Sequence, residues 1–177
     1  MPDSVVIRVP DPCLVVLVGA AGSGKSTFAA RHFAPDEVLS SDGYRKAVSG
    51  DATDQGATRP AFARLHRDVE RRLVAGRTVV VDATSVQLRA RRELLRIARA
   101  SGRQAIAIVL DLPAGVVLAR NAGRRAGIVP EAAVRRHLAD LRATMRPGVL
   151  EDEGFTAVVR LASPTDVDAA RVRRDRA

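Results

Sequence analysis

The segment Gly19–Ser26 reads GAAGSGKS, which has the glycine spacing and the final lysine and serine of a phosphate-binding loop. An apolar stretch precedes it and a helix-forming stretch follows it, which is the context in which this motif binds nucleotides. The glycines let the backbone curl so that its N–H groups point at phosphate oxygens, and the following helix adds its positive dipole end. The motif predicts binding of ATP or another NTP. The residues expected to contact it are Gly19, Ala20, Ala21, Gly22, Ser23, Gly24, Lys25, Ser26 and Thr27.

Two side chains of this loop suit a triphosphate and its metal ion. Lys25 is expected to reach the β- and γ-phosphates, and the Ser26 hydroxyl is expected to ligate Mg²⁺. Asp82 ends the apolar stretch Val79–Val81, as the metal-binding carboxylate of such sites does. An aspartate in that place can also be a plain strand-end or capping residue. We expect Mg²⁺ to bind at Ser26 and Asp82.

A second polar group, Ser40–Arg45, follows the next apolar stretch. In an open parallel sheet the carboxyl ends of the strands lie at one edge, so we expect this group beside the phosphate-binding loop. The Asp42 carboxylate can accept a proton from a hydroxyl acceptor during phosphoryl transfer. Arg45 lies one helical turn later and can hold an anionic group of that acceptor. The pattern indicates a kinase, and the lack of a guanine-reading N-K-x-D stretch disfavours a GTPase.

Apolar strands and amphipathic helices alternate along the chain, which places these groups on one framework. Strands are expected at 13–18, 37–40, 78–82, 105–110 and 156–161. Helices are expected at 25–33, 42–48, 59–75, through 90–97, and at 114–123, 131–145 and 166–173. Strands joined by crossover helices imply a parallel sheet covered on both faces. We expect one α/β domain over residues 1–177.

The composition limits the class of protein. Hydrophobic residues make up 46% and charged residues 28%, as in a globular protein, and no apolar run approaches the ~20 residues of a membrane helix. Cys13 is the only cysteine, which excludes an internal disulfide and a cysteine-based zinc site. The first ten residues lack the pattern of a signal peptide. Together these features favour a cytoplasmic protein without membrane contact.

The formal charge of +9 permits an anionic partner. Lys25 and Lys46 are the only lysines among 29 basic residues, so the rest are arginine, whose planar fork suits phosphate. A high arginine content is also typical of GC-rich genomes, so the charge by itself decides little. Aromatic residues are only 3%, which disfavours a base-stacking platform and favours recognition through phosphates.

Beyond the loop, the sequence resembles the 5′-hydroxyl polynucleotide kinases, in particular the kinase module of bacterial RNA-repair polynucleotide kinase–phosphatases. The likeness lies in Gly22–Ala29, in His32–Arg45 with its S-S-D-x-x-R pattern, and in Val80–Thr84. Shorter matches at 54–55, 65–66, 112–113, 120–121, 153–155 and 163–164 extend it over essentially the whole chain.

This resemblance implies a P-loop NTPase fold of the nucleoside-kinase type, with three layers, a parallel sheet of strand order 2-3-1-4-5 and a helical lid. It implies transfer of the γ-phosphate of ATP, or another NTP, to the 5′-hydroxyl end of RNA or DNA in nucleic-acid repair. Relatives also carry phosphatase and ligase modules. If the chain is one module of such a system, those modules are expected partners.

The resemblance also implies roles for single residues. Asp42 is the expected general base for the 5′-hydroxyl. Arg45, with Gln55 beside it, is expected to grip the first internucleotide phosphate of the acceptor. Arg120 and Arg124 are expected to be lid arginines that clamp the donor phosphates, and their i, i+4 spacing puts both on one helix face.

The chain departs from the family in the lid. Gly127 stands where a further arginine is typical, and Arg125 can substitute for it. Two other interpretations stay open: a kinase of a small hydroxyl acceptor such as a nucleoside, sugar or antibiotic, and a module that binds nucleotide without an acceptor. Arg45 and the net positive charge disfavour the first, and Asp42 disfavours the second.

Overall fold

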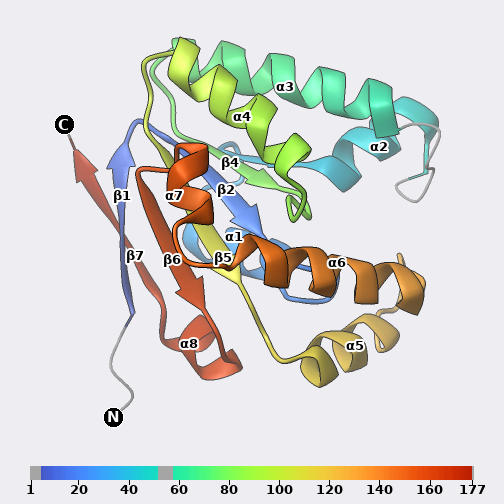
Figure 1. Ribbon diagram of the computed structural model, residues 1–177. Helices are drawn as coiled ribbons and strands as arrows, with labels where there is room; N and C mark the ends of the chain where they lie inside the picture. The colour runs from blue at the N-terminus through green and yellow to red at the C-terminus, as the bar shows by residue number, and fades with distance from the viewer. Residues whose placement is uncertain (1–4, 52–57, 177) are drawn as a thin grey trace.

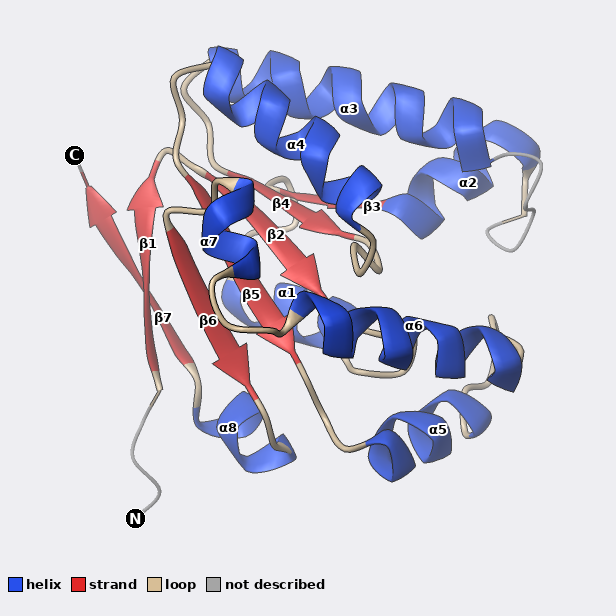
Figure 2. Cartoon of the chain, in the orientation of Figure 1, coloured by secondary structure: helices blue, strands red, loops and turns tan. Residues whose placement is uncertain are grey.

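The computed structural model describes residues 5–51 and 58–176, and its centre is a twisted parallel sheet (Figures 1 and 2). Its strands are β2 Leu14–Val18, β3 Val38–Ser40, β4 Val79–Asp82, β5 Ala105–Leu110 and β6 Ala157–Leu161. They are all parallel in the order β3-β4-β2-β5-β6, which confirms the expected order 2-3-1-4-5.

Helices connect the strands and cover the sheet (Figure 2). The longer ones are α1 Lys25–His32, α2 Ser41–Ser49, α3 Thr58–Val74, α4 Leu88–Ala100, α5 Ala114–Ala122 and α6 Glu131–Thr144. Two short ones are α7 Val149–Glu153 and α8 Pro164–Ala169; α7 was not expected from the sequence. None of the described helices is long and apolar enough to cross a membrane.

The central strand β2 shows why its sequence is apolar throughout. Leu14, Val16 and Val18 pack on one side with α3, α4 and α7. Val15 and Leu17 pack on the other side with α1. All five side chains are fully buried because each face of the sheet is covered, as is usual for a parallel sheet.

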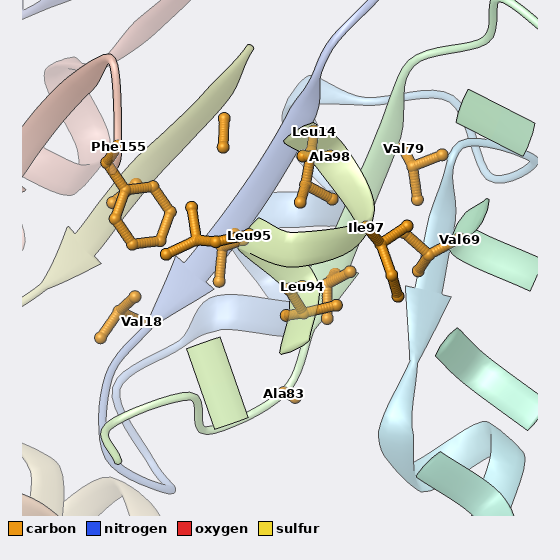
Figure 3. Close-up of a cluster of buried hydrophobic side chains, with 14 of the residues drawn as sticks. Leu14, Val18, Val69, Val79, Ala83, Leu94, Leu95, Ile97, Ala98 and Phe155 are labelled. Atoms are coloured by element: carbon orange, nitrogen blue, oxygen red, sulfur yellow. The ribbon is translucent and has the colours of Figure 1, made fainter. Parts of the chain in front are cut away.

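The larger core lies between the sheet and the helices α3 and α4. Leu94 and Ile97 of α4 point into it, and Val69 of α3 and Val79 of β4 lie on the same side (Figure 3). Leu65, Val69 and Leu73 recur at helical spacing in the sequence and form the buried stripe of α3. This core fixes β4, and with it the position of Asp82, against the centre of the sheet.

The two ends of the chain form a second sheet that the sequence analysis did not predict. β1 Val6–Asp11 pairs in parallel with β7 Arg171–Arg176. The predicted helix 166–173 is therefore wrong in its second half, because α8 ends at Ala169. Ile7 and Val172 pack on the α1 side of the core, while Arg171 and Arg173 are exposed, which is the two-residue period of a strand.

Candidate active site

The phosphate-binding loop connects β2 to α1 at the carboxyl edge of the sheet. Gly22 and Gly24 have φ angles of 89° and 96°, a region that side chains with a Cβ disfavour. A Cβ on Gly22 would also lie 2.6 Å from the carbonyl oxygen of Val117 in α5. Glycine is therefore required at Gly22 by both the backbone angle and the close approach of α5.

The Lys25 side chain is buried under this loop. Its Nζ donates hydrogen bonds of 2.9 Å to the carbonyl oxygens of Gly19 and Ala20. Burial lowers the pKa of Lys25 to about 8; the Asp82 carboxylate partly opposes this effect, and Arg124 adds to it. A buried ammonium group whose positive charge is only partly compensated favours the binding of an anionic ligand, because the ligand supplies the missing negative charge.

Ser26 and Asp82 lie next to each other although 55 residues separate them in the sequence. The Ser26 hydroxyl donates a 2.7 Å hydrogen bond to Asp82 Oδ2. β4 pairs with β2 so that Asp82 stands opposite Leu17, just before the loop. Mg²⁺ usually takes one or two protein oxygens together with phosphates and water, so this pair fits that ion. Among the described residues, no cluster of three or more His, Cys, Asp or Glu side chains offers another metal site.

Asp42 and Arg45 stand in the first turns of α2, directly after β3. The last residue of β3, Ser40, pairs with Asp82, so α2 starts at the same edge of the sheet. Arg45 donates to the Asp42 carboxylate in an ion pair. The Arg45 side chain is 18% exposed and the Asp42 side chain 59% exposed. Burial lowers the pKa of Arg45 from its usual value.

The opposite side of α2 is fixed to α3. The Tyr44 hydroxyl donates a 2.5 Å hydrogen bond to Asp68 Oδ2, and burial, followed by this bond, raises the pKa of Tyr44 to about 12. Asp68 also pairs with Arg71 on the surface of α3. The Tyr44 contact holds α2 against α3.

The lid consists of α5, α6 and the loop between them. A Cβ on Gly24 would lie 3.6 Å from Arg120 Nη1, so this arginine reaches the phosphate-binding loop. The buried Asn121 amide donates to the Val129 carbonyl at 2.7 Å and accepts from the Val129 N–H at 3.2 Å. This pair of bonds holds the two ends of the lid loop together. Arg124 lies within that loop and donates to the Gly127 carbonyl at 3.1 Å. The expectation that Arg120 and Arg124 share one helix face is therefore wrong, because α5 ends at Ala122.

A cavity of about 840 Å³ joins these parts. The residues singled out from the sequence that line it are Ala21, Gly22, Gly24, Lys25, Ser26, Thr27, Asp42, Arg45, Asp82, Arg120 and Arg124. Gly19, Ala20 and Ser23 do not line it; they shape the loop from behind, where Ala20 packs against the lid. Gln55 lies outside the described residues.

Other residues of the cavity wall were not assigned from the sequence. Arg136 and His137 of α6 line it, whereas Arg125, the expected substitute for a further lid arginine, does not. Arg31 of α1 and Asp168 of α8 form a 3.2 Å ion pair that also borders the cavity. Val134, Leu138 and Leu141 recur at helical spacing and are the buried stripe of α6, but which other side chains of α6 line the cavity depends on how the lid packs.

Comparisons with known proteins agree with this architecture. A family model described as an AAA domain matches residues 14–147. A search of curated proteins gives no match. A chain of the Pnkp1/Rnl/Hen1 RNA repair complex is 26% identical with a TM-score of 0.65; the match covers 77% of this chain and 46% of that chain. This protein thus spans less than half the length of that relative.

Two kinases of small molecules share the fold. A sugar kinase from Janibacter sp. HTCC2649 is 21% identical with a TM-score of 0.58, and the match covers 85% of each chain. A gluconokinase from Sinorhizobium meliloti 1021 is 18% identical with a TM-score of 0.56, covering 90% of this chain and 87% of that one. With the family model matching three quarters of the sequence, the chain belongs to this AAA domain family and has a P-loop kinase-like fold.

Proposed function

We propose that this protein is a polynucleotide 5′-kinase, which transfers the γ-phosphate of ATP or another NTP to the 5′-hydroxyl end of RNA or DNA. The observation that carries the proposal is the wall of the 840 Å³ cavity, which holds the phosphate-binding loop and the Asp42–Arg45 pair together. A donor on the loop and a hydroxyl acceptor at α2 would thus share one space. In phosphoryl transfer the protein contributes mainly by holding donor and acceptor close together, and little by covalent chemistry of its own side chains.

The charge of the wall favours an acceptor that carries phosphate. Six cationic side chains line the cavity: Lys25, Arg31, Arg45, Arg120, Arg124 and Arg136. Only three carboxylates line it with them: Asp42, Asp82 and Asp168. A neutral sugar or nucleoside would add no negative charge to this cationic wall, whereas an internucleotide phosphate would add one near Arg45. The 26% identity with a chain of an RNA repair complex supports the same choice. Phosphatase and ligase activities of such a system would come from other modules.

The chemistry would proceed in line. Ser26 and Asp82 would hold Mg²⁺, which neutralises charge on the donor phosphates. The acceptor oxygen would bond to the γ-phosphorus as the bond to the bridging oxygen of ADP breaks, and Asp42 would take the hydroxyl proton. Arg45 would hold the first internucleotide phosphate of the acceptor. Lys25, Arg120 and Arg124 would stabilise the charge on the transferred group.

The direct test is transfer of labelled γ-phosphate from ATP to single-stranded 5′-hydroxyl oligonucleotides with Mg²⁺. Nucleosides, sugars and gluconate should be offered as competing acceptors. We expect labelled 5′-phosphate on RNA or DNA oligonucleotides. Label on small molecules but none on oligonucleotides of several lengths would contradict the proposal and favour a small-molecule kinase.

Arg45→Ala should separate these two functions. A charge-assisted hydrogen bond is worth about 1.5–3 kcal/mol, so its loss should lower kcat/KM for an oligonucleotide roughly ten- to hundredfold. The loss should be smaller for a nucleoside, which has no internucleotide phosphate, and smaller in Arg45→Lys, which keeps the charge but not the fork. Steady-state kinetics on both acceptors measure the difference. An equal loss on both would assign Arg45 to the donor side or to the fold.

A further inference from the structure

One face of α6 borders the cavity that the phosphate-binding loop also lines. Val134 and Leu138 pack against Ala20 of the loop, together with Leu112 and Val117. Ala133 and His137, which lie beside that stripe on the helix, line the cavity. Because α6 packs directly on the loop, side chains from this face line the same cavity as Lys25.

The other end of α6 is anchored, so this face is held in place. Thr144 donates a 2.9 Å hydrogen bond to the Val86 carbonyl oxygen. The buried Arg91 donates to Thr144 at 3.3 Å and forms an ion pair of 2.6 Å with Glu153. Asp140 accepts a further bond of 3.1 Å from Gln87. These contacts tie α6 to the segment that follows β4 and limit its movement away from the loop.

His137 has an unused polar atom inside this wall. Its Nδ1 is buried without a hydrogen-bond partner among the described residues. Burial, and then the positive charges of Lys25 and Arg136 against the opposing Asp140, lower the pKa of His137. A neutral imidazole keeps one N–H donor and one acceptor, and a buried donor or acceptor left unpaired costs stability. His137 as a residue also lines the cavity, so its imidazole borders the space that a ligand would occupy.

Arg136 is the second polar side chain that α6 brings to the cavity. Its neighbour Arg135 pairs with Glu131 on the outside of the helix, but none of the ion pairs among the described residues involves Arg136. A guanidinium group without a carboxylate, at the wall of a cavity that also holds Lys25 and Arg120, is suited to an anionic ligand.

We infer that Arg136 and His137 form a second phosphate-binding wall, which contacts the polyphosphate of the donor nucleotide from α6. Arg136 pairs with phosphate oxygens, and His137 adds a hydrogen bond. The inference rests on the proposed function only in requiring that the loop bind a nucleoside triphosphate. It concerns the donor, so it holds for any acceptor.

The test is calorimetric binding of ATP, ADP and AMP, with Mg²⁺ and without any acceptor. Arg136→Ala should weaken ATP binding about ten- to hundredfold, because a charge-assisted bond is lost, and His137→Ala should weaken it about threefold to tenfold. The affinity for AMP, which lacks the β- and γ-phosphates, should fall much less in these variants. Arg136→Lys and His137→Gln should retain part of the affinity. Thermal unfolding of each variant checks that the fold is kept.

Two neighbours are matched controls. Arg135→Ala removes an arginine from the outer side of the same helix, and Arg125→Ala removes one from the lid loop; neither residue lines the cavity. Both should bind ATP within about twofold of the unaltered protein. Equal ATP affinity of Arg136→Ala and Arg135→Ala would overturn the inference for Arg136, as would an equal loss for ATP and AMP. Failure of the unaltered protein to bind ATP would overturn it entirely. An absence of oligonucleotide phosphorylation would overturn the proposed function and leave these affinities unchanged.

Discussion

Lys25→Ala should lower the rate of phosphoryl transfer about a thousandfold, because the transferred group loses the buried cation of the phosphate-binding loop. The Lys25 ammonium lies under the loop and already makes two 2.9 Å hydrogen bonds to its backbone. Burial lowers its pKa, so the site holds a positive charge that lacks full compensation until a triphosphate arrives. The measurement is single-turnover transfer of labelled γ-phosphate to whichever acceptor the unaltered protein uses.

The other lysine of the chain provides the control. Lys46 is exposed on α2, one residue after Arg45, and does not line the cavity. Lys46→Ala should keep the transfer rate within about twofold, since surface substitutions have small effects. If Lys25→Ala retained a large part of the activity while its thermal unfolding was unchanged, the donor phosphates would not lie on the loop as proposed.

Asp42→Asn should lower transfer about a hundred- to ten-thousandfold while ATP binding stays within about twofold. General acid–base catalysis contributes rate factors of this size, and an amide cannot take the proton of the acceptor hydroxyl. Asparagine keeps a carbonyl oxygen that can accept the hydrogen bond of Arg45, so the contact within α2 is retained. Transfer assays and calorimetric ATP binding together separate the acceptor side from the donor side.

Asp36→Asn is a suitable comparison, because Asp36 is an exposed aspartate that pairs with Arg77 away from the cavity. It should change neither transfer nor ATP binding by more than about twofold. A loss of ATP affinity in Asp42→Asn as large as that in Lys25→Ala would assign Asp42 to the donor or its metal. The general-base role would then be wrong.

The sequence by itself determined the features that depend on neighbouring residues. The glycines of Gly19–Ser26 and the flanking strand and helix identify the nucleotide site, because a phosphate-binding loop is made by a continuous stretch of backbone. The buried stripes of α3 and α6 follow from helical spacing, and Leu65, Val69, Val134 and Leu138 are buried as that spacing predicts. The apolar strands likewise lie in the sheet within one or two residues of their expected bounds.

Only the tertiary structure decided which distant residues meet. β1 and β7 pair although about 165 residues separate them in the sequence. The arginine-rich sequence of β7 lacks the alternation of apolar and polar residues that predicts a strand, and only the structure shows that Val172 of β7 and Ile7 of β1 pack on the core. The lid shows the same limit. Arg125 and Arg136 are both exposed, and local sequence does not distinguish them, but only Arg136 lines the cavity. The packing of Val134 and Leu138 on the phosphate-binding loop sets that orientation, and this contact joins residues that local patterns cannot connect.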